Sequence, residues 1–245
     1  MSIDVRPTRR RTVRQFVPPQ HGAWAMLLLP YLIGVILAGF RWPDLPLLGA
    51  WIAGYLLSYF ALQAIKTRRP QRFRPQLTWY ASITAGLALP VLLACPRLLL
   101  FAPAYAALLA VNGWYAHRRR ERALVNDLAS VVQSCLMVFV VAEVAGREPG
   151  RMLTPFLVVL LYFAGTVLYV KTMIRERGSS AYRRASVAYH AVALVVAAAL
   201  GPLQAAAFTV LLARAWVLAG RPLTPKQVGI AEIGASLLVL IAAVA

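Results

Sequence analysis

Acidic residues are scarce in this sequence: 8 Asp and Glu stand against 26 Lys and Arg in 245 residues, which leaves a formal net charge of +18. Charged residues make up only 14% of the chain and hydrophobic residues 60%, with a mean hydropathy of +0.67. A soluble domain is about half apolar and about a quarter charged. The composition therefore excludes an ordinary soluble domain. It also favours anionic lipid over nucleic acid as the partner of the basic residues, because basic loops of membrane proteins face anionic lipid.

Motifs for covalent chemistry are absent as well. The two cysteines, Cys95 and Cys135, fall at the end of one expected helix and inside another, so the sequence indicates neither a disulfide nor a cysteine metal site. No Ser/His/Asp spacing and no nucleophile elbow occurs in the chain. Hydrolysis and acyl transfer are therefore not expected, and no resident metal is predicted.

Long apolar runs are what the sequence has instead. Runs of about 17–20 residues match the length that a helix needs to cross the hydrocarbon core of a bilayer. We therefore expect an all-α membrane protein in which residues 22–245 form one transmembrane domain after a basic cytoplasmic segment, residues 1–21. The first run is expected to be retained as a helix, because it is long and no small-residue cleavage site closes it. Nine spans are predicted: Trp24–Phe40, Leu45–Ile65, Leu77–Ala94, Leu98–Ala116, Leu128–Ala145, Leu153–Val170, Ser186–Leu200, Leu203–Ala219 and Val228–Ala245.

The cations between these runs predict the orientation. When the N-terminus is placed in the cytoplasm and the spans alternate, 21 Lys and Arg fall in cytoplasmic segments and 4 in outer segments. Such an asymmetry predicts an N-in, C-out topology by the positive-inside rule. The outer four are Arg41, Arg97, Arg147 and Arg151. The connections that carry the cytoplasmic cations are also the longer ones, so any site is expected on that side.

Polar residues recur at one depth inside the expected spans. Counting about 1.5 Å per residue from the cytoplasmic helix ends places six of them ~5–10 Å inside the membrane. They either share a pocket that opens to the cytoplasm or each make a separate hydrogen bond between helices. Arg214 and Glu232 lie on consecutive antiparallel spans, and we expect a structural ion pair between them, with snorkelling of Arg214 to the interface as the alternative. The six residues are Gln63, Asn112, Gln133, His190, Arg214 and Glu232.

A short motif precedes the first span: Pro19-Gln20-His21-Gly22-Ala23-Trp24-Ala25-Met26, followed by Pro30. His21 is either a fixed donor or general base at the mouth of a pocket, or an exposed histidine of a helix entry. The motif resembles that of the YwiC-like family of bacterial integral membrane proteins, and the similarity extends over nearly the whole chain. The resemblance implies a bacterial integral membrane protein and no particular activity; with the orientation expected from the cations, we expect a multi-pass protein of the inner membrane with a cytoplasmic N-terminus.

The nine-helix arrangement is also similar to that of the UbiA superfamily of intramembrane prenyltransferases. In that superfamily, aspartate-rich motifs after the second and sixth helices hold Mg²⁺ and a prenyl diphosphate. This chain has basic residues in both places, residues 66–74 and residues 171–177, and only Asn126 and Asp127 resemble half of such a motif. Because Mg²⁺ prefers carboxylates and phosphate oxygens, the sequence argues against a Mg²⁺ cofactor.

Three functions stay open on the sequence alone. The first is a basic pocket that binds an isoprenoid phosphate or another anionic lipid without Mg²⁺, since Arg and Lys bind phosphate directly; if the protein is an enzyme, it is then a transferase of such a lipid phosphate. The second is a lipid transporter, and the third is a structural or assembly subunit of the membrane with no small ligand. The phosphate-binding candidates are Lys66, Arg68, Arg118, Lys171 and Arg175, and the residues that would orient a ligand or handle protons are His21, Asn112, Tyr115 and His190.

Overall fold

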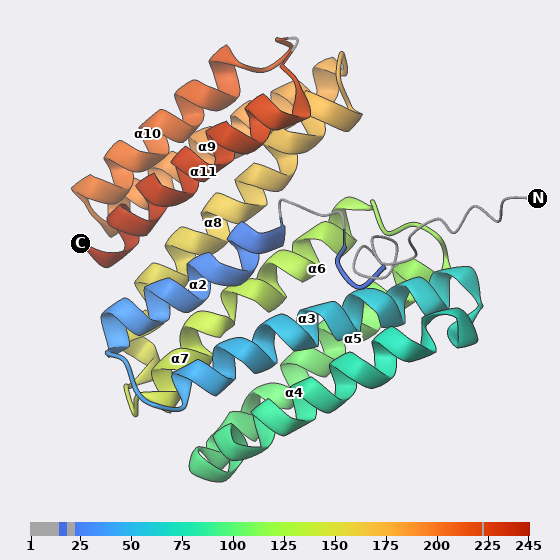
Figure 1. Ribbon diagram of the computed structural model, residues 1–245. Coiled ribbons are helices and arrows are strands. Elements are labelled where there is room, and N and C mark those ends of the chain that lie inside the picture. Colours follow the sequence, from blue (N-terminus) through green and yellow to red (C-terminus); the bar gives the residue numbers. More distant parts are fainter. Residues whose placement is uncertain (1–14, 19–22, 222) are drawn as a thin grey trace, which may run out of the picture.

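The computed structural model describes residues 15–18, 23–221 and 223–245 (Figure 1). All regular structure in these parts is helical, which confirms the expected class. Each predicted span corresponds to one helix, except the fifth, which is two helices broken at Leu136. The helices are α2 (Ala23–Ala38), α3 (Asp44–Thr67), α4 (Arg74–Ala94), α5 (Ala102–His117), α6 (Leu124–Cys135), α7 (Met137–Val144), α8 (Leu153–Val170), α9 (Ser180–Leu200), α10 (Pro202–Val217) and α11 (Pro225–Val244).

Most of these helices, taken with their short extensions, are long and apolar enough to cross a membrane. Within the described residues seven are long and apolar enough, and two shorter apolar helices, α2 and α10, accompany them. Short 3₁₀ helices extend α4, α5 and α8 at their N-terminal ends: η1 (Pro70–Phe73), η2 (Pro96–Phe101) and η3 (Pro149–Met152). A π-helix, η4 (Lys171–Arg175), continues α8 at its C-terminal end. The chain is thus a multi-pass helical membrane protein.

The helices form a central layer with one group of helices on each side of it (Figure 1). The α6–α7 pair and α8 lie at the centre, with 44% and 50% of their apolar stretches buried, against 11% for those of α4 and α5. Helix α2 packs on α6, α7, α8 and α11, while α3, α4 and α5 lie on one side and α9, α10 and α11 on the other. Helix α6 packs on α5 and helix α8 packs on α9 and α11, so each central helix meets one of the two outer groups.

A close helix crossing fixes α2 against α7. A Cβ added at Gly34 would lie 2.8 Å from the Cβ of Val141 and 3.4 Å from the carbonyl oxygen of Val138. Lipid offers no hydrophobic drive for helices to associate, so they associate where small residues let their backbones approach. Gly34 is such a position. Ser134 of α6 adds a hydrogen bond to the Met26 carbonyl of α2.

The segments predicted to face outward meet at one end of the bundle. Arg147 donates from Nε to the Ala38 carbonyl at 3.0 Å, which joins the connection after α7 to the end of α2. Arg97 Nε lies 3.2 Å from Glu143 Oε1, which joins the start of η2 to the end of α7. The connections at this end are therefore neighbours in space.

The start of α9 differs from the prediction. The helix begins at Ser180, two turns before the predicted Ser186, because the hydroxyl of Ser179 caps it by accepting from the Tyr182 N–H at 3.4 Å. Arg183 and Arg184 are exposed in these first turns. Hydropathy marks only the apolar part of a helix, so the sequence prediction missed the polar turns.

The close crossing predicts that Gly34→Ala destabilises the protein by about 1–3 kcal/mol, because the new methyl group collides with Val141 on a packed neighbour. Thermal unfolding of the purified protein in detergent measures the loss. Gly86→Ala is the matched control: Gly86 lies on α4 with nothing within 4 Å of an added Cβ, so the change raises stability by up to about 1 kcal/mol through helix propensity. Equal effects of the two substitutions would contradict the close crossing.

Candidate functional site

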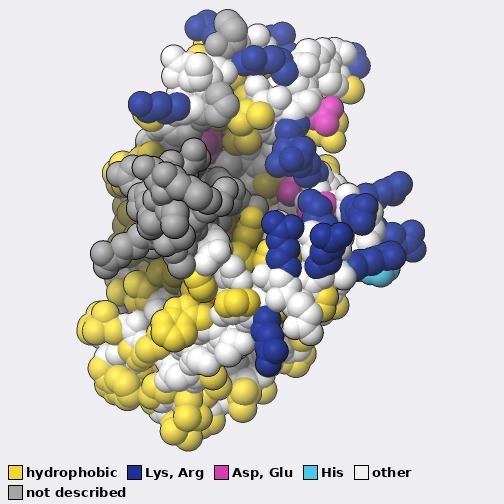
Figure 2. Space-filling model, turned by 45° about the vertical axis from the view of Figure 1, so that its right-hand side comes forward, with side chains coloured by type: hydrophobic (Ala, Val, Ile, Leu, Met, Phe, Trp, Pro, Cys, Tyr) yellow, Lys and Arg dark blue, Asp and Glu magenta, His cyan; other side chains and the backbone are white. Residues whose placement is uncertain are grey.

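Basic side chains gather at the end of the bundle opposite to Arg97 and Arg147, and we call this the basic end. Figure 2 shows many of the Lys and Arg side chains clustered along one side of the molecule. Arg177 donates from Nη2 to the carbonyl oxygens of Leu223, at 2.9 Å, and Arg221, at 3.3 Å, which links the α8–α9 connection to the α10–α11 loop. The described cations of the basic end are Lys66, Arg68, Arg69, Arg72, Arg74, Arg118, Arg119, Arg120, Arg122, Lys171, Arg175, Arg177, Arg183, Arg184, Arg221 and Lys226.

Lys66 forms an ion pair with Glu121, across the end of α3 and the loop that joins α5 to α6. Partial burial alone would raise the pKa of Glu121, but the hydrogen bond from Lys66 and the positive charges of Lys66 and Arg122 outweigh it and hold this pKa below its usual value. Since the folded-state pKa is lowered, the pair stabilises the fold above the ordinary carboxyl range and is lost as the pH falls through the folded-state pKa. The positive charge of Lys66 is therefore balanced by Glu121.

Lys171 is buried and holds the same loop from the other side. Its Nζ lies 2.7 Å from Asp127 Oδ2 and donates to the Arg122 carbonyl at 2.6 Å. The first residue of the π-helix η4 is thereby fixed to the start of α6. The prediction had placed Lys171 on a ligand phosphate, whereas here its charge is met by Asp127.

Asn112 completes the support of this loop. Its side-chain amide donates to Asn126 Oδ1 at 2.8 Å and to Ser130 Oγ at 3.2 Å. Asn126 in turn donates to the Glu121 carbonyl at 2.8 Å. Asn126 and Lys171 thus hold the carbonyls of Glu121 and Arg122, with Asn112 supporting Asn126, and their polar groups are used within the protein.

A hollow of about 580 Å³ opens above this support. It is lined by Lys66, Arg119, Arg120, Glu121, Arg122 and Ala123. Glu121 is already paired with Lys66, and within the described residues none of the three arginines forms an ion pair. The hollow therefore carries a surplus of three guanidinium groups, all exposed.

The other phosphate-binding candidates are not among the residues that line this hollow. Arg68 ends α3 with a left-handed backbone, φ 56°, and is exposed. Arg118 lies over the ring of Trp114, with Cζ 5.0 Å from the centroid, and Trp114 makes an edge contact with half-buried Tyr115. Arg175 is exposed on η4.

A second hollow of about 310 Å³ lies between α9 and α10. Arg183, Arg184, Val187, Ala188 and Trp216 line it, and its surface is almost entirely apolar. Guanidinium groups beside an apolar groove suit a lipid whose head is anionic.

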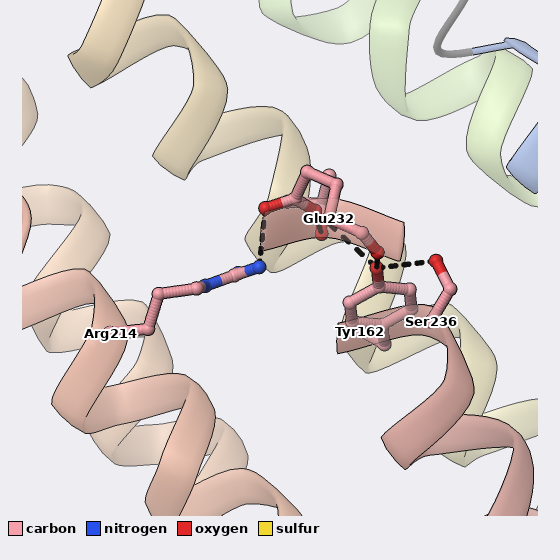
Figure 3. Close-up of polar contacts among 5 residues, drawn as sticks. Tyr162, Arg214, Glu232 and Ser236 are labelled. Carbon is pink, nitrogen blue, oxygen red and sulfur yellow. Dashed lines mark hydrogen bonds and ion pairs between the residues drawn. The ribbon is translucent and has the colours of Figure 1, made fainter. Parts of the chain in front are cut away.

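Inside the bundle, Arg214 of α10 forms an ion pair with Glu232 of α11 (Figure 3). The carboxylate of Glu232 also accepts from Thr166 Oγ1 at 3.0 Å and from the Tyr162 hydroxyl at 3.4 Å. The Tyr162 hydroxyl is 2.9 Å from Ser236 Oγ. We call these five residues the charged centre. They join α8, α10 and α11 by polar contacts in a region that is otherwise apolar.

The six polar residues predicted at one depth are thus divided. Asn112 bonds to α6, and Arg214 and Glu232 form the charged centre. His190 is buried on α9, where Nδ1 lies 2.7 Å from the Ser186 carbonyl oxygen and the ring packs on Gly165 of α8. Gln63 and Gln133 are half-buried and make no side-chain hydrogen bond within the described part of the chain. His21, the other catalytic candidate, lies outside the described residues.

Sequence reasoning missed the partners rather than the charged residues. Asp127, Asn126, Thr166, Tyr162 and Ser236 hold the candidates in place. Of these partners, only Asn126 and Asp127 could have been found in the sequence, because an amide and an acidic residue stand directly after a basic loop. Nothing in the spacing of the other three distinguishes them from ordinary helix residues. Among the described residues, no group of three or more His, Cys, Asp or Glu could hold a metal ion.

Fold and site together define the class: a helical multi-pass membrane protein with one basic end and a buried ion pair in its interior. The YwiC-like protein family model matches residues 17–142. The chain is 32% identical over 223 residues to uncharacterized protein YwiC of Bacillus subtilis, covering 90% of this chain and 93% of that protein. An uncharacterized protein of Haemophilus influenzae is 31% identical over 222 residues, with the same coverage. The chain therefore belongs to the YwiC-like family. No solved structure matches it.

The Lys171–Asp127 pair predicts that Lys171→Met lowers the stability by about 2–4 kcal/mol, because Asp127 is left without its partner in a largely buried place. Thermal unfolding in detergent measures the loss. Arg175→Met, on the same π-helix but exposed, is the control and is expected to change stability by less than about 0.5 kcal/mol. If the two variants unfold at the same temperature, Lys171 does not hold the loop.

Proposed function

We propose that this protein binds the phosphate group of an anionic amphiphile, an isoprenoid phosphate or an anionic phospholipid, at its basic end without Mg²⁺. The observation that carries the proposal is the surplus of three arginines in the hollow, Arg119, Arg120 and Arg122, with the one acid of the hollow already paired to Lys66. A guanidinium binds phosphate through two parallel hydrogen bonds, which supply both charge and orientation. The proposal is for binding and includes no catalytic step.

The arrangement beneath the hollow supports this proposal. A ligand site needs residues whose positions are fixed before the ligand arrives. Here Asn126 and Lys171 bond to the Glu121 and Arg122 carbonyls, so the backbone that carries the arginines is held in place. Lys66 lines the hollow, and Arg68 and Arg118, two and one residues from lining residues in the sequence, are proposed to add charge to the head-group site. Asn112 and Lys171 are proposed to act through the loop and not on the ligand.

We also propose that the basic end faces the cytoplasm and that the protein lies in the bacterial inner membrane. Its support is the distribution of cations: sixteen described Lys and Arg belong to the basic end, against four at the other end. Cytoplasmic loops of membrane proteins carry such an excess. The cytoplasmic leaflet is also where anionic lipid attracts basic segments, by about 1 kcal/mol per residue near the surface.

A structural role without a ligand is the second candidate. The pairs Lys66–Glu121 and Lys171–Asp127 favour it, because they show basic residues used to join helices of the same protein. In that case the remaining arginines are solvated and contact the bilayer without selecting one lipid. The two candidates differ in whether a defined lipid stays with the purified protein.

The head-group proposal predicts that the triple variant Arg119→Gln, Arg120→Gln, Arg122→Gln loses at least about 90% of a phosphate-headed lipid that the wild type retains, because tenfold weaker binding follows from losing about 1.4 kcal/mol. Native mass spectrometry of the purified proteins measures the retained lipid. The control is Arg69→Gln, Arg72→Gln, Arg74→Gln, which removes the same charge from exposed residues of the basic end that line neither hollow. Wild-type retention in the first triple variant, or equal losses in both, would refute the hollow as the site.

The orientation predicts the reactivity of single cysteines in a variant that lacks Cys95 and Cys135. A cysteine at Glu148, exposed between α7 and η3, should react with a membrane-impermeant thiol reagent in intact spheroplasts. A cysteine at Ser180, exposed at the start of α9, should react only after the membrane is permeabilised. The reverse pattern would show that the basic end faces outward.

A further inference from the structure

Arg214 has a free edge inside the protein. Its Nη1 points to Glu232, while Nε and Nη2 are buried and face no hydrogen-bond acceptor. Nε and Nη2 lie along one edge of the planar guanidinium, where two parallel N–H groups can donate to two oxygens of one carboxylate or phosphate. The side chain of Arg214 is only 9% exposed. An unpaired donor in such a place costs about 1–3 kcal/mol.

Glu232 cannot satisfy this edge, because its carboxylate is already engaged by Arg214 Nη1, Thr166 and Tyr162 (Figure 3). These contacts fix the plane of the guanidinium and leave Nε and Nη2 directed away from the pair. The charged centre therefore has the form of a positioned donor group with its counter-ion already in place. Such a group can accept an oxyanion without first losing a partner.

Tyr169 adds a further unpaired donor beside Arg214. The guanidinium carbon of Arg214 lies 4.2 Å from the centroid of the Tyr169 ring, and Tyr169 is fully buried. The Tyr169 hydroxyl has no hydrogen-bond partner among the described residues. Two neighbouring side chains thus keep three buried polar atoms without acceptors, which is unusual because buried polar groups are nearly always paired.

These atoms lie close beneath the basic end. Arg214 is three residues before the last residue of α10, which is about 4–5 Å along the helix, and Tyr169 directly precedes the last residue of α8. The π-helix η4 follows α8 directly. Such π-helical turns are rare in proteins, and those that occur are often found at functional sites. Leu223, after α10, packs against the apolar cluster of Tyr169, Met173, Ala215 and Val228, and its carbonyl accepts from Arg177.

We propose that Arg214 and Tyr169 form an oxyanion-binding position for the phosphate or carboxylate head of an amphiphile, reached when Leu223 moves away from the cluster that contains Tyr169. The position rests on the proposed function, since it assigns the head group a deeper site in addition to the hollow. Arg214 donates through Nε and Nη2, Tyr169 through its hydroxyl, and Glu232 keeps the guanidinium oriented. Breaking the Arg177 bonds to Leu223 and Arg221 opens the path.

The test compares wild-type protein with Arg214→Lys and Tyr169→Phe by thermal unfolding in detergent micelles that contain dioleoylphosphatidic acid or dioleoylphosphatidylcholine. Phosphatidic acid should raise the wild-type midpoint by about 5 °C more than phosphatidylcholine does. Arg214→Lys keeps a charge opposite Glu232 but lacks the second edge, so its affinity for phosphatidic acid should fall at least about tenfold. Tyr169→Phe should unfold no earlier than wild type without lipid, because it removes an unpaired hydroxyl, yet bind at least about threefold more weakly.

The control is Tyr182→Phe, which removes the hydroxyl of a half-exposed tyrosine in α9. This variant should bind phosphatidic acid as tightly as the wild type. If wild type prefers phosphatidic acid while Arg214→Lys and Tyr169→Phe bind it equally well, the deeper site is refuted and the proposed function stands. If wild type shows no preference, both fail. Inorganic phosphate is tested alone as a third arm: a stabilisation that Arg214→Lys abolishes would support the oxyanion position and show that it takes a free anion.

Discussion

A charged side chain in the hydrocarbon layer is stable only where another group of the protein neutralises it, and this constraint decides which helices of the bundle are neighbours. Arg214 and Glu232 join α10 to α11, and the hydroxyls of Thr166 and Tyr162 bring α8 to the same carboxylate. Because lipid is as apolar as leucine, apolar side chains cannot by themselves select one helix arrangement. Polar partners and close crossings such as that at Gly34 select it instead.

The same constraint explains why some cations of the basic end form ion pairs and others do not. Lys171, which is buried, has Asp127 as its partner, and Lys66 has Glu121. Arg119, Arg120 and Arg122 are exposed and form no ion pair within the described residues. Acidic residues are too few to neutralise every cation, and the four that form ion pairs within the described residues each join two helices or a helix and a loop. The surplus faces the surface where an anionic head group can meet it.

The sequence predicts the spans well, because the length and hydropathy of a run are local properties. If the spans cross the membrane in alternating directions, every second connection lies at the same end, which gathers the basic loops there. The contacts of Arg177, Lys66 and Lys171 join these connections. The sequence does not predict the partners, because a partner depends on how each helix is rotated and which helix lies beside it. Asn112 and Arg214 are predicted at one depth, yet Asn112 bonds to α6 and Arg214 to α11. The break after Cys135 and the π-helix at Lys171 also leave no hydropathy signal.

A double-mutant cycle on Arg214 and Glu232 tests most directly the claim that buried charges determine the packing of this bundle. The variants are Arg214→Met, Glu232→Met and the double variant, and the free energy of unfolding is measured for each in detergent. We expect each single change to destabilise by about 3–5 kcal/mol, because it leaves one charge unpaired, and the double variant to recover at least about 2 kcal/mol of the summed loss. Additive effects, or single variants as stable as the wild type, would contradict the account.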